Sequence, residues 1–215
     1  MMIDINNIAN KEEKIKIARK IVENVKNNQV IGFGSGTTSY LAAIEIGKYV
    51  RENNLSITAV PTSNAIEEIC NKYDIKIGKL SENTLDWAFD GADEVDEDSN
   101  MIKGKGRALF REKLNLLNSK ENFILVDKTK LVKKLGEKDF VPIEVYPDAI
   151  RYVKEELKKL NALEFNTIGE TENNNTLIEA KFENIEFDME KKIKLIPGVI
   201  ESGLFMGYNV KVITN

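Results

Sequence analysis

The order of apolar segments predicts an α/β protein with a doubly wound parallel sheet and a second, smaller α+β domain. Short apolar runs alternate with amphipathic helical segments over residues 12–130, as expected for a mainly parallel sheet with helices on both faces. From about Gly136 the order becomes strand, helix, strand, strand, helix, strand, which is a ferredoxin-like unit. The last run, 208–213, is left over as a closing strand that can rejoin the first sheet.

Apolar spacing places the elements of the first domain. Residues 12–27 have apolar side chains at helical intervals, and residues 29–34 form the first continuous apolar run. The further segments follow in the same way: we expect helices over 37–53, 61–72 and 107–118, and strands over 56–60, 75–80, 85–89 and 122–127.

The second domain is expected within residues 136–206, and the first in residues 1–135 plus 207–215. Asp148 and Asp188 are suited to cap the two helices of the second domain, because a side-chain oxygen there can accept a backbone N–H of the first turn. The strands of this domain are expected over 141–146, 163–167, 176–182 and 199–205.

Composition excludes several classes of function. A formal net charge of −4 gives no support to a broad surface for nucleic acid or anionic membrane. Cys70 is the single cysteine and cannot form an intramolecular disulfide, which fits a reducing cytoplasm. The first 14 residues lack the order of a signal peptide, and no apolar run approaches about 18 residues, so we expect neither export nor membrane insertion.

The chain has no histidine. This absence excludes Ser-His-Asp and Cys-His nucleophilic systems, HExxH zinc sites and any imidazole acid-base step. One cysteine without histidine cannot supply the usual zinc ligand sets. Proton chemistry must therefore use carboxylates, lysines or tyrosines.

Residues 85–113 concentrate the side chains that indicate a site. The apolar run 85–89 is followed by Asp90 and Asp93, and ligands of open α/β sheets bind at that end of parallel strands. A loop with cations and glycines, 103–107, suits an anion. In the next helix Glu112 has Ala108, Leu109 and Leu116 at i−4, i−3 and i+4, so it should be partly buried, with a pKa raised towards that of a general base.

Each of these residues also has a simpler interpretation. A single aspartate after a strand is more often a turn former or helix cap, and a glutamate on an apolar face can be held in a structural ion pair. The combination is more specific, because two acids, an anion loop and an inward glutamate within one strand-loop-helix unit supply most parts of a proton-transfer site for a small anion.

A second anion loop is predicted where the strand 29–34 gives way to a helix. Gly34, Ser35, Gly36, Thr37 and Thr38 place backbone amides and hydroxyls at a helix N-terminus, which favours a phosphate. The spacing is not GxGxxG and the next strand ends in a proline, so a phosphoester is favoured over a dinucleotide. A tight turn with a helix cap explains this motif alone equally well.

These motifs together resemble one family, the ribose-5-phosphate isomerases of the A type. The resemblance spans nearly the whole chain, through GFGSGTTS at 32–39, DGADEVD at 90–96, IKGKGRALFREK at 102–113, VDKTKLVKKLG at 126–136, VPIEVYP at 141–147 and IPGV at 196–199. It implies a Rossmann-like domain with the ferredoxin-like domain inserted before the last strand. It also implies interconversion of D-ribose 5-phosphate and D-ribulose 5-phosphate without cofactor or metal.

The resemblance assigns roles to residues of this chain. The catalytic base matches Glu112, the ring-opening acids match Asp90 and Asp93, and the electrophilic lysine matches Lys103, with a phosphate-side lysine matching Lys14. The implied substrate-binding residues are Ser35, Gly36, Thr37, Thr38, Asp90, Gly91, Ala92, Asp93, Lys103, Gly104, Lys105, Gly106 and Lys130. Lys105 and Arg107 depart from the family pattern, which usually has glycines and alanines there.

The implied partners are a sugar phosphate and further copies of the chain, as a homodimer or homotetramer in the cytoplasm, with no nucleic acid and no membrane. The main competing function is that of a non-catalytic sugar-phosphate sensor, although the chain shows no appended helix-turn-helix module. Two related enzyme classes compete as well: an amino-sugar phosphate deaminase, which normally relies on histidine, and a CoA-transferase, which needs a nucleotide-sized pocket. Which aspartate performs which step stays open.

Overall fold

The computed structural model describes residues 8–215, which form two compact units. The first unit contains residues up to 91, residues 111–129 and residues 209–215, and the second contains residues 92–110 and 130–208. The domain boundaries expected from the sequence differ from these units in residues 92–110, 130–135 and 207–208, and they stay a prediction. The expectation about export rests partly on residues 1–7, which lie outside the described residues.

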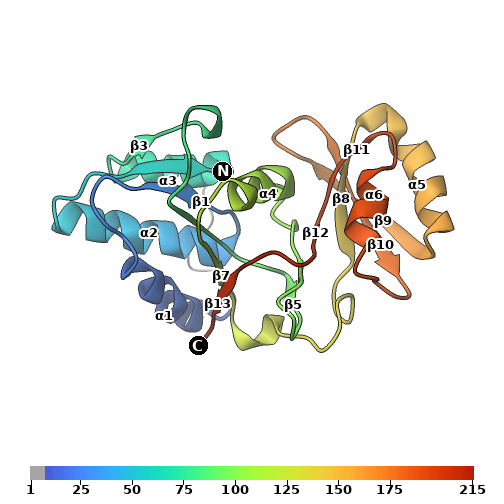
Figure 1. Ribbon diagram of the computed structural model, residues 1–215, viewed down its shortest axis with the longest axis horizontal. Helices are drawn as coiled ribbons and strands as arrows, with labels where there is room; N and C mark the ends of the chain where they lie inside the picture. The colour runs from blue at the N-terminus through green and yellow to red at the C-terminus, as the bar shows by residue number, and fades with distance from the viewer. Residues whose placement is uncertain (1–7) are drawn as a thin grey trace. The chain divides into compact units, whose positions relative to one another are not determined.

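The first unit is built on a six-stranded parallel sheet with the order β13-β7-β4-β1-β2-β3 (Figure 1). This order confirms the predicted doubly wound topology. Its strands are β1 (Val30–Phe33), β2 (Thr58–Pro61), β3 (Lys76–Ile77), β4 (Trp87–Asp90), β7 (Asn122–Leu125) and β13 (Lys211–Ile213), and its helices are α1 (Lys11–Val22), α2 (Thr37–Glu52), α3 (Asn64–Lys72) and most of α4 (Leu109–Leu117).

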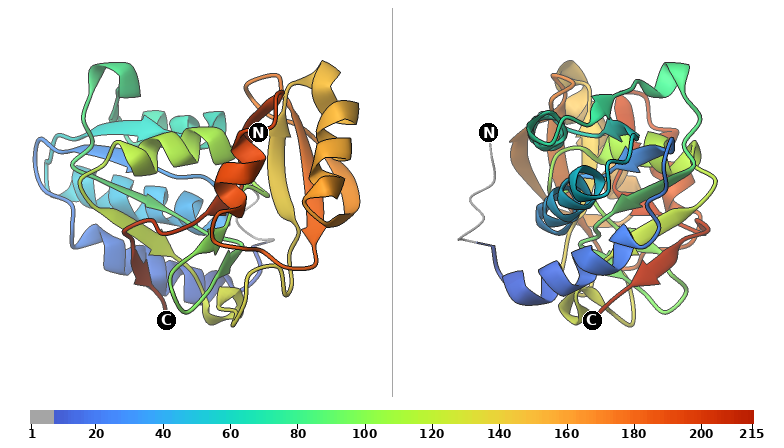
Figure 2. Two further views of the ribbon diagram at one scale, coloured as in Figure 1. Left: turned by 45° about the vertical axis from the view of Figure 1, so that its right-hand side comes forward. Right: turned by 90° about the vertical axis from the view of Figure 1, so that its left-hand side faces the viewer.

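Helices cover both faces of this sheet because its strands are apolar on both sides. Ile31 and Phe33 of β1 belong to the core that also contains buried apolar residues of α1, α2 and α3. Gly32 lies on the other face, where Asn115 of α4 donates to the Val60 carbonyl at 2.8 Å. Figure 2 shows α4 on one side of the sheet, with α1 and α2 on the other.

The second unit contains the predicted α+β domain. Its four-stranded antiparallel sheet has the order β11-β8-β10-β9, which is the strand order of a ferredoxin-like βαββαβ unit. Its strands are β8 (Val141–Val145), β9 (Ala162–Glu170), β10 (Thr176–Phe182) and β11 (Val199–Ser202), and its helices are α5 (Ile150–Lys159) and α6 (Met189–Lys194). One apolar core joins both helices to one face of this sheet.

A three-stranded sheet of the second unit was not predicted. It consists of β5 (Glu94–Val95), β6 (Met101–Ile102) and β12 (Leu204–Phe205), in the order β12-β6-β5. The single strand expected over 199–205 is therefore divided between two sheets. The division falls at Gly203. Its N–H donates to the Pro142 carbonyl at 2.7 Å, and its carbonyl accepts the backbone N–H of Lys103 at 2.8 Å.

Several boundaries also differ from expectation. α1 ends at Val22, and the chain then turns so that Asn28 adopts a left-handed φ of 64°. β3 stops at Ile77 and is followed by a short 3₁₀ helix, η2 (Leu80–Glu82). Two further 3₁₀ helices are η3 (Lys128–Lys130) and η4 (Pro147–Ala149). None of the helices within residues 8–215 combines the length and the apolar character needed to span a membrane.

Candidate active site

Hydroxyl side chains of the first unit meet where β1 and β2 end. Ser35 follows β1, and its Oγ lies 2.7 Å from Thr62 Oγ1 and donates to Ser63 Oγ at 2.8 Å. Thr62 Oγ1 also donates to the Phe33 carbonyl, at 3.1 Å. Because β1 and β2 are parallel, their carboxyl ends place these hydroxyls at the edge of the sheet that binds ligands in this kind of fold. The sequence prediction included Ser35 but missed Thr62 and Ser63.

The N-terminus of α2 lies directly after this cluster. Gly36 precedes the helix with a left-handed φ of 90°, and as glycine it offers no side chain to cap the first amides. Lys14 of α1 is buried, and its ammonium donates to Thr37 Oγ1 at 3.0 Å. Uncapped amides, the helix dipole and a lysine are features that together suit an anion.

Asp90 ends β4 at the same edge of the sheet and is 4% exposed. Its Oδ1 accepts the N–H of Gly91 at 2.7 Å and the hydroxyl of Ser39 at 3.2 Å. Gly34 makes this position possible, since a Cβ at Gly34 would lie 2.2 Å from Asp90 Cγ. The turn after β1 therefore requires a glycine because of the carboxylate at the end of β4.

Glu112 lies on α4 and is 4% exposed, with buried Ala108, Leu109 and Leu116 at the neighbouring helical positions. This burial agrees with the expectation from helical spacing. Glu112 and Asp90 line the same small cavity of the first unit. Ala88, Phe89, Leu116 and Phe123 are among the apolar residues that complete its wall. Two of the predicted catalytic carboxylates thus share one largely apolar enclosure.

The remaining predicted catalytic residues, Asp93 and Lys103, belong to the second unit. Lys103 follows β6 and is 2% exposed. Its ammonium lies 5.4 Å from the centroid of the Phe205 ring, which is within the range of a cation–π contact. Phe205 lies in β12, which pairs with β6, so the three-stranded sheet positions both the lysine and the ring.

Asp93 has an altered acidity. Burial raises the pKa of its carboxyl group, while the backbone N–H of Lys105, which donates to Oδ2 at 3.2 Å, lowers it. The charges of Lys103, Lys130 and Lys105 also lower this pKa, but burial dominates. The carboxyl group therefore stays protonated at higher pH than an ordinary aspartate, which suits a group that both donates and accepts protons.

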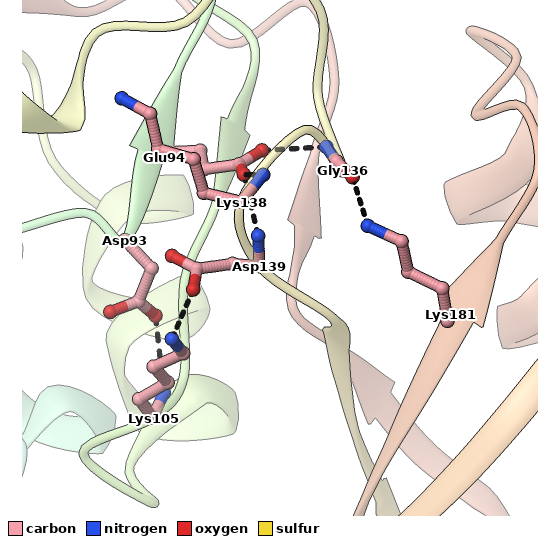
Figure 3. A network of polar contacts seen from close by, with 7 residues as sticks. All are labelled: Asp93, Glu94, Lys105, Gly136, Lys138, Asp139 and Lys181. Atoms are coloured by element: carbon pink, nitrogen blue, oxygen red, sulfur yellow. Dashed lines mark hydrogen bonds and ion pairs between the residues drawn. The ribbon is translucent and has the colours of Figure 1, made fainter.

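Two acids that the sequence did not single out surround this part of the second unit (Figure 3). Asp139 forms an ion pair with the ammonium of Lys105. Glu94 is fully buried and accepts the backbone N–H groups of Gly136, Lys138 and Asp139 at 2.6, 2.6 and 2.8 Å. No local pattern could have found these contacts, because the partners of Glu94 lie 42 to 45 residues further along the chain.

The described residues thus divide the predicted site into two groups. Ser35 to Thr38, Asp90, Gly91 and Glu112 lie in the first unit, whereas Ala92, Asp93, Lys103 to Gly106 and Lys130 lie in the second. Within residues 8–215, no group of three or more carboxylate or cysteine side chains is arranged to hold a metal ion.

Sequence comparison decides the family. Residues 58–215 match the family model described as ribose 5-phosphate isomerase A (phosphoriboisomerase A). The chain belongs to the ribose 5-phosphate isomerase A family. It is 39% identical over 208 residues to ribose-5-phosphate isomerase A of Methanocaldococcus jannaschii, covering 92% of each chain. It is 40% identical over 208 residues to the Pyrococcus horikoshii protein of the same name, covering 91% of each.

Solved structures of this family have the same fold. A ribose 5-phosphate isomerase A structure from Methanocaldococcus jannaschii superimposes with a TM-score of 0.92 at 37% identity, over 96% of this chain and 95% of that one. A D-ribose-5-phosphate isomerase solved in complex with phospho-erythronic acid gives a TM-score of 0.91 at 36% identity, over 97% and 96%. The predicted family and the predicted fold class are therefore confirmed.

Proposed function

We propose that this member of the family interconverts D-ribose 5-phosphate and D-ribulose 5-phosphate through an enediolate, without metal or cofactor. The observation that carries the proposal is the small cavity that both Asp90 and Glu112 line. Both side chains are 4% exposed, so water is largely excluded from the place where a proton would be transferred. The relative solved with phospho-erythronic acid, a phosphorylated four-carbon sugar acid, supports the substrate class.

The first step opens the furanose ring. A proton must leave the anomeric hydroxyl, and a proton must reach the ring oxygen as the bond between C1 and that oxygen breaks. Asp90 and Asp93 are the residues proposed for this exchange. The raised pKa of Asp93 supports a role as the protonated partner, although either aspartate can begin the step.

The second step moves one hydrogen between two carbons. Glu112 takes the proton from C2 of the open aldose, and the electrons form the enediolate. The proton of the C2 hydroxyl passes to the C1 oxygen, and Glu112 returns its proton to C1 to give the ketose. Lys103 stabilises the negative charge that develops on the carbonyl oxygen. A preorganised cation in a site with little water can lower such a barrier by several kcal/mol.

Binding is assigned to the two anion loops. Ser35, Gly36, Thr37 and Thr38 are proposed to hold the phosphate at the start of α2, where uncapped amides and Lys14 support an anion site. The other proposed contacts come from Gly91, Ala92, Gly104, Lys105, Gly106 and Lys130. Replacing Lys130 should then weaken substrate affinity more than turnover.

The biological setting follows from the same proposal. The reaction belongs to the non-oxidative pentose phosphate pathway, and we propose a cytoplasmic enzyme acting as a homodimer or homotetramer. Light scattering on the purified chain would measure the oligomeric state.

A direct assay tests the activity. The purified chain, incubated with ribose 5-phosphate in the presence of EDTA, should form the ketose, detected by its colour reaction or absorbance. A sugar-phosphate sensor would bind without turnover, an amino-sugar phosphate deaminase would need an amino sugar, and a CoA-transferase would need an acyl-CoA. If no ketose forms from ribose 5-phosphate, the proposed isomerase activity is refuted.

Glu112→Gln tests the assignment of the base. The amide has nearly the same shape but cannot accept the proton, so kcat should fall by about 10²- to 10⁴-fold while KM changes little. Glu67→Gln is the matched control, since Glu67 is an exposed residue of α3 in the same unit and should leave kcat unchanged. Near-native turnover of the Glu112 variant would show that another group is the base.

A further inference from the structure

A closed circuit of polar contacts surrounds Asp93 within the second unit (Figure 3). The Asp93 carboxylate accepts the backbone N–H of Lys105, and the ammonium of Lys105 is paired with Asp139. The backbone N–H of Asp139 donates to Glu94, which is bonded to Asp93 through the chain. Each of the four residues is thus linked to two others of the circuit.

Glu94 connects this circuit to the turn at 136–139. Its carboxylate has no exposed surface, and both of its oxygens accept backbone N–H groups, Oε2 from Gly136 and Oε1 from Lys138 and Asp139. Three such bonds to one carboxylate define the course of the turn at 136–139. Lys181, which donates to the Gly136 carbonyl, adds a contact on the other side of the turn.

The ion pair of Lys105 and Asp139 completes the circuit, because Lys105 also donates its backbone N–H to Asp93. The side chain of Asp139 is 14% exposed and that of Lys105 is 44% exposed, so this ion pair is partly open to water. Glu179 is a further charge close to Lys105, and burial raises the pKa of the Glu179 carboxyl group, with smaller upward effects from Asp139 and Asp93. Lys105 is therefore the cation among three carboxylates, those of Asp93, Asp139 and Glu179.

We propose that Glu94, Lys105 and Asp139 are positioning residues that hold the carboxyl group of Asp93 and the loop that carries Lys103. In this arrangement none of the three side chains touches the substrate, which replaces the substrate contact proposed above for Lys105. The inference rests on the proposed function, because it concerns how the ring-opening acid of that reaction is oriented. A small displacement of a reacting group can cost a large part of the rate, so positioning of this kind is measurable.

The proposal differs from direct binding of substrate by the Lys105 side chain, and the two make opposite predictions for Asp139. If Lys105 binds the substrate anion, then Asp139→Asn frees its ammonium and should lower KM. If Lys105 acts through the circuit, then Asp139→Asn and Lys105→Met break the same contact and should lower kcat alike.

The test uses four variants of the full chain and one control. Lys105→Met and Asp139→Asn each remove the ion pair, and the double variant removes both partners together. Lys105→Arg keeps the charge. Lys138→Met is the matched control, because it removes a positive charge from the same turn while its backbone N–H to Glu94 remains.

We expect kcat to fall about tenfold in Lys105→Met and in Asp139→Asn, with the double variant no worse than either single variant. Lys105→Arg should restore most of the rate, and Lys138→Met should match the wild type. The alkaline limb of the pH–rate profile should move to higher pH in Lys105→Met, because Asp93 acts as the protonated partner and loses a cation beside it, while Lys103 and Lys130 remain and Glu179 still opposes ionisation. Additive losses, a lower KM in Asp139→Asn or an unmoved pH profile would overturn the proposal.

A second measurement separates this inference from the proposed function. The titration of the Asp93 carboxyl carbon, followed by ¹³C NMR without substrate, should move to higher pH in Lys105→Met relative to the wild type and to Lys138→Met. An unchanged titration would refute the circuit even if the wild type isomerises ribose 5-phosphate. A shifted titration in a chain without isomerase activity would instead refute only the proposed function.

Discussion

The carboxyl group of Asp93 lies among influences that act on its pKa in opposite directions. Burial raises the pKa, whereas the N–H of Lys105 and the charges of three lysines lower it, and the net direction is upward. Asp86 of the first unit is the opposite case. The hydrogen bond from Lys120 and the backbone N–H of Val30 lower the pKa of Asp86, and burial opposes them less strongly.

This contrast predicts opposite pH dependences of stability for two matched variants. A carboxyl group with a raised folded-state pKa stabilises the fold while it is protonated, and this contribution is lost as the pH rises through that pKa. Asp93→Asn should therefore gain stability relative to the wild type as the pH rises from about 3 towards neutrality. Asp86→Asn should lose relative stability over the same range, because its contribution is present only above the unfolded-state pKa.

Urea unfolding of the three proteins at a series of pH values measures both slopes. The sign of the difference matters more than its size, since both carboxylates also make hydrogen bonds that an amide alters. Parallel pH dependences for the two variants would show that burial does not dominate at Asp93.

Single residues also show what local sequence can indicate. The burial of Glu112 followed from three apolar neighbours within one helical turn on either side, and the position of Asp90 followed from the end of an apolar run. Glu94 looked like one acid among several in DGADEVDED. Its burial depends on a turn more than 40 residues away, so spacing within the motif carries no information about it.

At the scale of elements, the ends of β1 and β4 approach each other closely. The N–H of Gly34 donates to the Phe89 carbonyl at 2.8 Å, and a Cβ at Gly34 would lie 2.5 Å from that oxygen and 2.2 Å from Asp90 Cγ. The backbone oxygen cannot move without separating the strands. The geometry of the predicted phosphate loop and that of Asp90 are therefore coupled through this one contact.

Gly34→Ala tests that coupling. The added methyl group should destabilise the protein by about 1–3 kcal/mol through overpacking, and it should lower turnover because Asp90 is displaced. Gly91→Ala is the control for stability, since the nearest atom to a Cβ there is the Leu125 carbonyl oxygen at 3.7 Å. Chemical denaturation should leave Gly91→Ala close to the wild type. Equal stability of the two variants would contradict the close approach of β1 and β4.

The elements that sequence reasoning missed are the shortest ones. β5, β6 and β12 have two residues each, and so few residues show no alternation of apolar and polar side chains. Longer elements such as β8 and β10 were placed nearly to the residue, because apolar runs bounded by prolines or polar turns define them. The three short strands are nevertheless what brings Phe205 beside Lys103.

At the scale of the whole molecule, each unit is assembled from separate stretches of chain. The alternation of strands and helices was enough to predict the parallel sheet, and the change of order near Gly136 was enough to predict the second sheet. The assignment of 92–110 to the second unit was not predictable in this way, since those residues follow directly from the strand that ends at Asp90.

The closing strand β13 gives this architecture a testable consequence. Residues 211–213 pair with β7, the Val126 N–H donates to the Ile213 carbonyl at 3.1 Å, and Ile213 packs against the main core of the first unit. Ile213→Ala should lower stability by about 1–3 kcal/mol, which for a chain of this size lowers Tm by about 2–4 °C per kcal/mol. Lys211→Ala is the control, because its ion pair with Glu121 is exposed and should contribute less than about 1 kcal/mol. Thermal unfolding followed by circular dichroism compares the two, and a Tm for Ile213→Ala no lower than that of Lys211→Ala would mean that the closing strand does not stabilise the sheet it completes.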